Sequence, residues 1–261
     1  MAIELFNAED VEKLRRAGRA AAATLAHVAE RIRVGVSSAD IDGWVREDTA
    51  RRGGRPSQLG YRPSPAMPAF SGACCVSIDH EVCHGVPSAS RRLCAGSIVN
   101  VDITTELAGF HGDTSRTFCV GEASPEALHV VDVAERCLRA GIARVRPGAR
   151  LGEIGYAIEQ LAEREGCSVV RDYGGHGIGR QMHCEPHVLH VGRPDRGLRL
   201  KAGMVFTVEP MINLGRAEVM TEGNQWTVVT LDGSLSAQFE HTILVTTEGA
   251  EILTEGGDIL I

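Results

Sequence analysis

Residues 100–118, NVDITTELAGFHGDTSRTF, carry the clearest indication of the fold. Apolar and polar residues alternate on each side of a short turn, which is the pattern of a β-hairpin. If the turn is centred between Leu107 and Ala108, Asp102 lies directly opposite Asp113. Facing side chains of an antiparallel pair lie roughly 5 Å apart, where like charges are destabilising. The hairpin therefore raises the question of what allows two carboxylates to meet.

Length and composition restrict the classes of protein to consider. The chain has 261 residues, a formal net charge of −7, 43% hydrophobic residues, 23% charged residues and 30 glycines. It is long enough for a sizeable core, and nothing in it is typical of a disordered, collagen-like or coiled-coil chain. The acidic balance argues against nucleic acid as the main partner, because phosphate binding requires a basic face. Small arginine clusters are interpreted as solvated surface charge.

The cysteines and the N-terminal segment indicate the compartment. None of the eight cysteines forms a CxxC pair, so neither a zinc knuckle nor a redox motif is predicted. The chain begins with a charged amphipathic helix in place of a signal peptide, and we expect free thiols in a reducing cytoplasm. No apolar run approaches the roughly 20 residues that a membrane span requires.

Capping residues and periodicity predict the order of the elements. Helices are expected at residues 7–33, from Ser37 or Ser38 to the Gly53-Gly54 pair, from Ser124 to the Pro147-Gly148 break, and at residues 151–166. Strands are expected at residues 74–79, in the hairpin, and at 203–210, 225–230 and 236–246, with the turn at 231–234 joining the last two. Helix pairs thus alternate with strands, which indicates two similar halves. Since no linker interrupts the pattern, we expect one α/β domain spanning residues 1–261.

Three further segments place ionisable groups among apolar residues. His176 and His183 lie in GGHGIGRQMHCEPH, Glu209 in MVFTVEPMIN and Glu240 in SAQFEHTILV. Taken singly, each has a simpler interpretation as a solvent-facing carboxylate or a hydrogen-bonded histidine. Taken together with the hairpin, they leave four carboxylates and one or two imidazoles on separate elements, and carboxylates rarely lie in such runs unless paired or bound to metal. This set of ligands favours Mn, Fe, Co or Zn.

Two divalent ions would answer the question that the hairpin raises. Metals roughly 3.5–4 Å apart, bridged by carboxylates, would relieve the repulsion between Asp102 and Asp113. Such a pair also converts a bridging water into hydroxide near neutral pH, so hydrolysis is the expected reaction.

Competing motifs fail on their context. The glycine-rich GGHGIG is followed by Pro186, which makes a poor start for the helix of a nucleotide-binding loop. The spacing of His183, His187 and His190 suggests a zincin helix, but the same proline and the absence of a glutamate beside His183 argue against it. Cys83 and His84 are neighbours on a predicted strand, so they should point to opposite faces and not form a thiol-protease pair.

Five motifs together resemble the type I methionine aminopeptidases: EVCHGVP, NVDIT…GFHGDTSRTF, YGGHGIGRQMHCEPHV, GMVFTVEPMI and TLDGSLSAQFEHT. The resemblance covers roughly residues 10–248. It implies the pita-bread fold, an α/β (α+β) architecture in which two pseudo-symmetric halves place antiparallel strands around a dinuclear metal site, with helices outside. It also implies removal of the initiator methionine from nascent polypeptides with a small second residue, by a metal-bridged hydroxide that attacks the first peptide bond.

The resemblance assigns roles to individual residues. Asp102 would chelate one metal, Asp113 and Glu240 would bridge both, and His176 and Glu209 would bind the other metal.

The same resemblance assigns the reacting groups and the pocket. Glu209 would also transfer the proton of the attacking water, His183 would contact the scissile carbonyl, and His84 would lie near the substrate's backbone nitrogen. The methionine pocket is expected to consist of Met67, Phe70, Cys75, Met182 and Trp226.

The chain departs from the common pattern of this family at two places. Met67 and Met182 stand where aromatic rings are expected, and methionine is flexible enough to make the pocket more plastic. Asp79-His80 replaces the usual Asn-Glu in the segment that, with Ser236, supplies a monovalent-cation site in some relatives. The chain lacks both the N-terminal extension of longer members and the type II insert. We therefore expect a minimal bacterial cytoplasmic enzyme that acts as a monomer, meets nascent chains at the ribosome, and has no membrane or direct nucleic-acid role.

Two rival functions remain. An X-Pro aminopeptidase or prolidase shares the fold but usually carries an additional N-terminal domain. A metal-free pita-bread module that binds peptides, histones or RNA would have lost metal ligands, whereas all five positions are present here.

Overall fold

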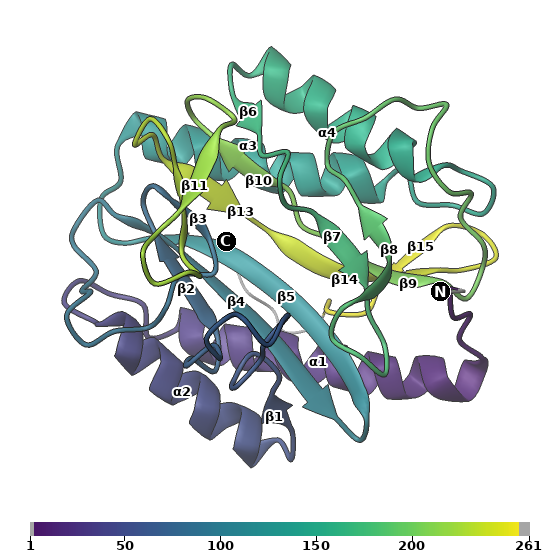
Figure 1. Ribbon diagram of the computed structural model, residues 1–261, viewed down its shortest axis with the longest axis horizontal. Helices are drawn as coiled ribbons and strands as arrows, with labels where there is room; N and C mark the ends of the chain where they lie inside the picture. The colour runs from purple at the N-terminus through teal and green to yellow at the C-terminus, as the bar shows by residue number, and fades with distance from the viewer. Residues whose placement is uncertain (1–2, 256–261) are drawn as a thin grey trace.

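The structure is a computed structural model that describes residues 3–255 (Figure 1). Within those residues it has four helices, α1 (Ala8–Ala29), α2 (Ser38–Arg51), α3 (Pro125–Ile142) and α4 (Leu151–Arg164). No helix in this part of the chain is long and apolar enough to cross a membrane. The helices begin at the predicted caps, because the side chains of Asn7, Ser37 and Ser124 accept hydrogen bonds from backbone N–H groups of the first turn.

A large sheet forms the centre of the molecule. Its strands follow the order β1-β4-β5-β14-β9-β7-β8, with β2 paired to β4 and β15 paired to β14, and every pairing is antiparallel. The strands are β1 (Arg55–Pro56), β2 (Cys75–Ile78), β4 (Ile98–Leu107), β5 (Phe110–Cys119), β7 (Gly175–Gly177), β8 (Cys184–Val188), β9 (Val205–Val208), β14 (Glu240–Val245) and β15 (Ala250–Ile252).

Two three-stranded sheets complete the described fold. One has the order β13-β10-β6 and the other β11-β12-β3. Their strands are β3 (Glu81–Cys83), β6 (Ser168–Val169), β10 (Met211–Asn213), β11 (Val219–Thr221), β12 (Val228–Thr230) and β13 (Ser236–Gln238).

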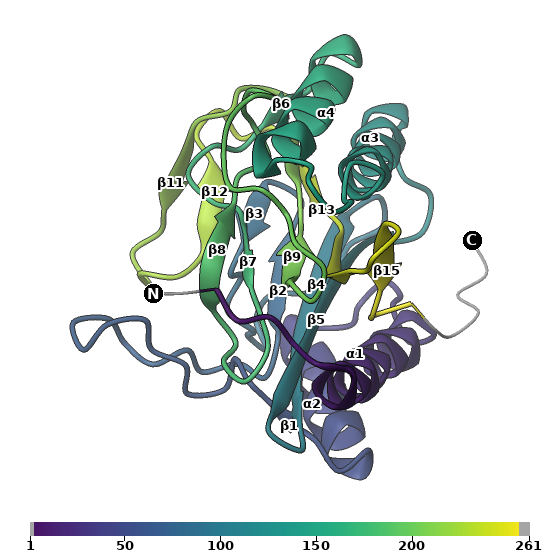
Figure 2. The same ribbon diagram turned by 90° about the vertical axis from the view of Figure 1, so that its right-hand side faces the viewer.

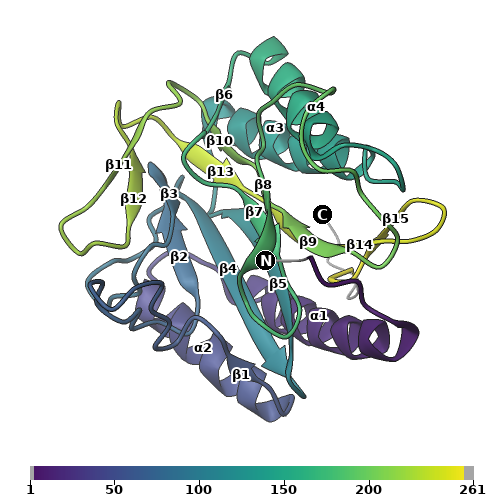
Figure 3. The ribbon, with the colours of Figure 1, turned by 45° about the vertical axis from the view of Figure 1, so that its right-hand side comes forward.

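The helices cover the strands from two opposite sides. Figure 2 shows α1 and α2 below the strands and α3 and α4 above them. One buried apolar cluster joins α3 and α4 to β9, β13 and β14, and another joins α1 and α2 to β2 and β4. In Figure 3 the strands β7, β8 and β9 from the later part of the chain lie near β4 and β5 from the earlier part. This arrangement brings the two helix–strand halves together along the line where β5 pairs with β14.

Helix α1 lies unusually close to strand β5. A Cβ atom placed on Gly112 would lie 2.4 Å from the backbone nitrogen of Gly18, a distance that real side chains do not reach. Gly112 is therefore required for the helix to pack against the strand, whereas a Cβ on Gly18 would lie 2.3 Å from the carbonyl oxygen of Leu253.

The structure corrects the register predicted for the hairpin. Asp102 faces Ser115, and Asp113 faces Thr104, so the turn is centred one residue later than predicted. Ala108 and Gly109 both have positive φ angles, which identifies them as the turn residues. Moving the turn by one residue shifts the pairing by two, and side chains alternate with a period of two. The two aspartates therefore still share one face of the sheet, as diagonal neighbours.

Two strand predictions were also wrong in detail. The segment predicted as one strand at residues 236–246 divides at Phe239 into β13 and β14, which belong to different sheets. The turn at 231–234 joins β12 to β13, but these strands pair with other partners and form no hairpin. Local pattern does not reveal such a change of sheet.

Candidate active site

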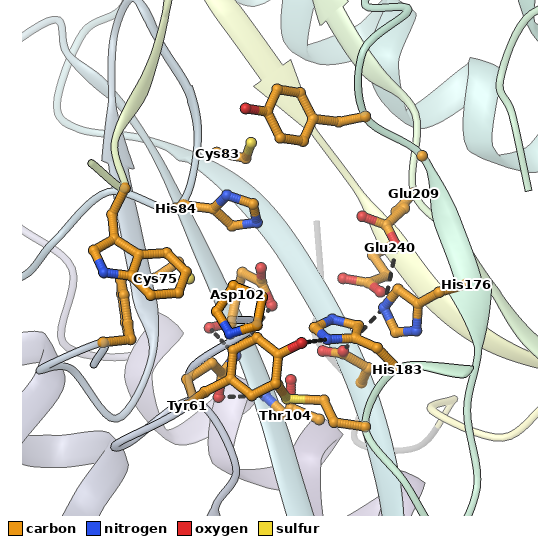
Figure 4. A pocket seen from close by; sticks show the side chains of 18 of the residues that line it. Tyr61, Cys75, Cys83, His84, Asp102, Thr104, His176, His183, Glu209 and Glu240 are labelled. Atoms are coloured by element: carbon orange, nitrogen blue, oxygen red, sulfur yellow. Dashed lines mark hydrogen bonds and ion pairs between the residues drawn. The ribbon is translucent and has the colours of Figure 1, made fainter. Parts of the chain in front are cut away.

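A cavity of about 550 Å³ lies between the two halves and is lined by every residue predicted for the metal centre, the reacting groups and the methionine pocket. Its polar part is lined by Asp102, Asp113, His176, Glu209 and Glu240, from β4, β5, β7, the end of β9 and β14. Figure 4 shows Asp102, His176, Glu209 and Glu240 pointing into the same cavity. Residues separated by more than a hundred positions in the chain thus form one cluster.

The most compact part of the cluster has the geometry of a metal site. Asp113, His176 and Glu240 each offer a ligand atom, and these atoms lie within 4.8 Å of one another. The His176 Nε2 atom lies 3.7 Å from Asp113 Oδ2 and 3.6 Å from Glu209 Oε1. Asp113 and Glu240 are almost completely buried.

The carboxyl groups form two pairs that are within hydrogen-bonding reach. Asp102 approaches Asp113, and Glu209 approaches Glu240. Burial raises the pKa of Asp113 to about 6 and that of Glu209 to about 8. Burial, followed by the charges of Asp113 and Glu209, raises the pKa values of Asp102 and Glu240 well above their usual range. Without a cation, such carboxyls can coexist only by keeping protons.

The imidazole in this cluster is neutral. Burial, followed by the proximity of His183, lowers the pKa of His176 to about 3. His176 Nδ1 lies 3.1 Å from the carbonyl oxygen of Gly177, which therefore accepts a hydrogen bond from Nδ1–H and leaves Nε2 as a free acceptor. That nitrogen faces the carboxylates, as a metal ligand must.

The residues present fit a divalent cation. Asp113 Oδ1 is buried and has no hydrogen-bond partner among residues 3–255, although buried carboxylate oxygens are normally satisfied. The donor set of carboxylates and one imidazole suits borderline divalent ions and contains no thiolate within the compact group.

Several polar residues that orient the cluster were not predicted from sequence. The Thr207 hydroxyl donates to Glu209 Oε1 at 2.7 Å, and Gln238 Nε2 donates to Glu209 Oε2 at 3.2 Å. The buried His190 accepts the backbone N–H of Glu209 through Nε2 at 3.1 Å. On the other side, Gln58 Nε2 donates to the Asp102 carbonyl oxygen at 3.2 Å. Apart from Thr207, which lies two residues before Glu209, these side chains contact residues at least 19 positions away, so the local sequence does not identify them.

His84 and His183 face the same cavity (Figure 4). His84 follows β3 with a φ of 55°, a left-handed conformation that is uncommon outside glycine and is enriched at functional sites. Burial lowers its pKa to about 4. His183 lies before β8, and its ring centroid is 4.2 Å from that of His176. Tyr61, which was not predicted as a site residue, lies 2.7 Å from His183 Nδ1 through its hydroxyl.

The apolar end of the cavity is lined by the five residues predicted for the pocket: Met67, Phe70, Cys75, Met182 and Trp226. The rings of Phe70 and Trp226 meet edge to face at 5.2 Å. The indole Nε1–H of Trp226 donates to the carbonyl oxygen of Pro68 at 3.1 Å, which connects the ring to the loop that carries Met67.

One exclusion made from sequence reached its conclusion for the wrong reason. Cys83 and His84 line the same cavity and do not point to opposite faces, because β3 ends at Cys83 and His84 has left-handed backbone. Burial nevertheless raises the pKa of the Cys83 thiol far above its usual value, so it is not a nucleophile at neutral pH. The hypothesis of a zincin helix is also excluded, because that motif places its histidines on a helix and His187 lies on strand β8.

The segment predicted to hold a monovalent cation is ordered by internal hydrogen bonds. The Asp79 carbonyl oxygen accepts the backbone N–H of Ser236 at 2.9 Å, and its carboxylate accepts the N–H of Ile98 at 2.9 Å. Ser236 Oγ is buried and has no partner within the described residues. A cation at this place stays a prediction.

Comparison with known proteins gives a consistent family. The sequence model of metallopeptidase family M24 matches residues 12–247. Methionine aminopeptidase B of Synechocystis sp. is 48% identical to this chain, over 96% of the chain and 91% of its own length. The crystal structure of methionine aminopeptidase from Rickettsia prowazekii has a TM-score of 0.93 at 43% identity, covering 97% of this chain and 100% of that one.

More distant structures share the architecture alone. The prolidase from Pyrococcus furiosus has a TM-score of 0.77 at 19% identity and covers 97% of this chain, but this chain spans only 66% of that one. The pita-bread fold expected from the sequence motifs is confirmed by these likenesses.

Proposed function

This chain belongs to metallopeptidase family M24 as a type I methionine aminopeptidase, and from that premise we propose that it removes the initiator methionine from nascent polypeptides with a small second residue. The observation that carries the proposal is a single cavity with a cluster of buried carboxylates and imidazoles at one end and an apolar pocket at the other. An N-terminal methionine needs both parts of the cavity. Its side chain is apolar and suits the pocket, and its α-amine is attracted to the negative charge of the cluster.

The cluster would hold divalent ions. Asp113, His176 and Glu240 form the compact site, and Asp102 and Glu209 lie where they would extend it to a second ion. When bound, such ions polarise a carbonyl oxygen and make water at the site more acidic. Co, Mn, Fe and Zn all suit these ligands.

Glu209 is the group that would move the proton. Its two oxygens are held by Thr207 and Gln238, and its pKa of about 8 in the metal-free protein shows how readily burial favours its protonated form. A carboxyl so placed can take a proton from the attacking water and deliver it to the nitrogen of the leaving peptide.

The two histidines would hold the peptide bond. His183 would donate a hydrogen bond to the scissile carbonyl, where negative charge develops in the transition state. His84 would lie beside the substrate's backbone nitrogen. Both rings are neutral at pH 7, because desolvation in the cavity is the largest cause that lowers their pKa values to about 4.

The apolar pocket would select methionine. Phe70 and Trp226 offer ring edges and faces to a thioether, a contact that is favourable by roughly 0.3–1.5 kcal/mol. Met67 and Met182 replace two rigid rings expected in this family, so the pocket would adapt to the unbranched side chain by changing rotamers.

Substitutions test the metal ligands and the reaction separately. Asp113→Ala or Glu240→Ala should abolish turnover and reduce the metal content, because each removes a shared ligand. His183→Ala should lower turnover and leave the metal content intact. Loss of metal in His183→Ala would mean that this residue belongs to the metal site instead.

Substrate choice separates the rival functions. The purified protein should release methionine from Met-Ala-Ser and leave an X-Pro dipeptide uncut. Preference for the X-Pro dipeptide would favour a prolidase-like hydrolase. A protein that stays inert and metal-free with Mn, Fe and Co would favour a peptide-binding module.

The cellular setting follows from this substrate. We propose that the chain acts as one catalytic domain and as a monomer in the cytoplasm, on nascent N-termini that emerge from the ribosome.

A further inference from the structure

Tyr61 connects the apolar pocket to the histidine that would face the scissile carbonyl. Its hydroxyl oxygen lies 2.7 Å from Nδ1 of His183, and the bond is drawn as a dashed line in Figure 4. Its ring centroid lies 5.0 Å from the His183 ring and 6.5 Å from the Trp226 ring. One side chain therefore contacts both the pocket wall and His183.

The two partners in this bond differ in how firmly they are held. The backbone N–H of Tyr61 donates to the Gln58 carbonyl oxygen at 2.9 Å, and its own carbonyl accepts the N–H of Phe70 at 2.9 Å. His183 lies in the irregular segment between β7 and β8. Within residues 3–255 its side chain makes one hydrogen bond, the bond to Tyr61. The orientation of the imidazole therefore depends on the tyrosine.

The direction of the bond follows from the partners of the hydroxyl. In the described part of the chain the Tyr61 hydroxyl makes no second hydrogen bond, so it is free to donate to Nδ1. A neutral imidazole that accepts at Nδ1 carries its proton on Nε2. The ring then presents an N–H donor on the side opposite the tyrosine.

We propose that Tyr61 is a positioning residue that fixes the tautomer and the orientation of His183, so that Nε2–H donates to the scissile carbonyl. The inference rests on the proposed function for the role of His183, and it adds the residue through which that role is set. Tyr61 also contacts the Trp226 side of the pocket. The first side chain of a bound substrate would therefore contact Tyr61, the residue that orients His183. Recognition of the first side chain and the rate of cleavage are thereby linked.

Kinetics of Tyr61→Phe test the proposal. This change removes only the hydroxyl, and kcat on Met-Ala-Ser should fall by about 10- to 100-fold, the range expected when a reacting group is misplaced. KM and the metal content should change little, since the phenyl ring still lines the pocket. The matched control is Tyr156→Phe, which removes a hydroxyl from an exposed tyrosine on α4 and should leave kcat unchanged.

A double-mutant cycle distinguishes positioning from a separate contribution. In the His183→Ala background, Tyr61→Phe should cause no further loss of kcat, because the residue through which Tyr61 acts is gone. An equal loss in both backgrounds, or an unchanged kcat in Tyr61→Phe alone, would overturn the proposal.

The tautomer can be measured without catalysis. In the ¹⁵N spectrum of the metal-free wild-type protein, the Nδ1 of His183 should show the shift of an unprotonated acceptor and Nε2 that of a protonated donor. In Tyr61→Phe the two tautomers should mix. A wild-type ring with its proton on Nδ1 would refute the proposal. Failure of the wild type to cleave Met-Ala-Ser would instead refute the proposed function, and the spectrum would still report on Tyr61.

Discussion

Replacing Glu209 with glutamine should stabilise the metal-free protein at neutral pH. Glutamine has nearly the same shape as a protonated glutamate and keeps hydrogen-bonding capacity towards Thr207 and Gln238. The side chain is only 12% exposed, so solvent screens its environment weakly. A stabilising substitution at the proposed proton-transfer residue would show that burying this carboxyl lowers the stability of the metal-free protein.

The magnitude follows from the pKa. Burial raises the pKa of Glu209 from 4.5 to about 8, so at pH 7 the carboxyl is protonated in the folded protein and ionised in the unfolded chain. Between pH 4.5 and pH 7, about 2.5 pH units, folding therefore takes up a proton. Over this range the free energy of unfolding falls by about 1.4 kcal/mol per pH unit. Wild type therefore loses about 3 kcal/mol of stability between pH 4.5 and pH 7, and Glu209→Gln avoids that loss. The advantage should vanish near pH 4.5 and reach its limit above pH 8.

Urea unfolding after chelation measures this difference. Both proteins should have the same free energy of unfolding near pH 4.5, and the variant should exceed wild type by about 3 kcal/mol at pH 7. For a chain of this size that difference corresponds to about 6–12 °C in Tm. Glu218→Gln is the control, because Glu218 is an exposed glutamate in an ion pair with Arg216, and its removal should bring no such gain.

Addition of metal should reverse the order. A divalent ion requires the ionised carboxylate, so the wild type should gain more stability than the variant from added Mn or Co. If the metal-free variant is no more stable than wild type at pH 7, the Glu209 carboxyl is already ionised and the reasoning from burial is wrong.

Three further outcomes are expected. Gly112→Ala should lower the free energy of unfolding by about 1–3 kcal/mol, since its Cβ would clash with α1 at Gly18; urea titration showing no loss would contradict the close packing. Asp48→Ala should cost about 2 kcal/mol at pH 7, because the carboxylate bonds Arg52 and Thr24. Burial alone would raise the pKa of Asp48, but those bonds outweigh burial and hold it below 3.8, so the cost should shrink in unfolding curves taken below that pH. Trp226→Ala should reduce the preference for methionine over smaller first residues in a competition assay, and unchanged preference would place the ring outside the binding pocket.

The starts of three helices could be predicted from sequence because capping is local, whereas the first helix, predicted to reach residue 33, ends at Ala29. Each capping side chain accepts a hydrogen bond from a backbone N–H within three residues, so both partners lie in one short window of sequence. This holds for Asn7, Ser37 and Ser124. The sequence also predicted correctly that Asp102 and Asp113 share one face of the sheet, because a register error of two residues leaves the face of a side chain unchanged. The register itself depended on which residues adopt positive φ in the turn, and alternation does not specify that.

The residues that hydrogen-bond to the site residues could not be predicted from local sequence. Tyr61 and Gln58 lie in a segment with no ionisable pattern, His190 belongs to a histidine spacing that suggested a different site, and each acts on a residue at least 19 positions away. The change of sheet at Phe239 likewise separates β13 from β14 without any break in the apolar run. A side chain's partner across the fold depends on the path of the whole chain, which no single window of sequence contains.

The order of amino acids was enough to predict where three helices begin, which face of the hairpin carries the acids and which residue types the reaction requires. These properties depend on a residue's own chemistry and on its near neighbours. Folding sets how deeply the carboxyls are buried, which of them raise one another's pKa values, and which tyrosine contacts His183. The physical reason is that desolvation and long-range hydrogen bonds arise only when distant segments exclude water together.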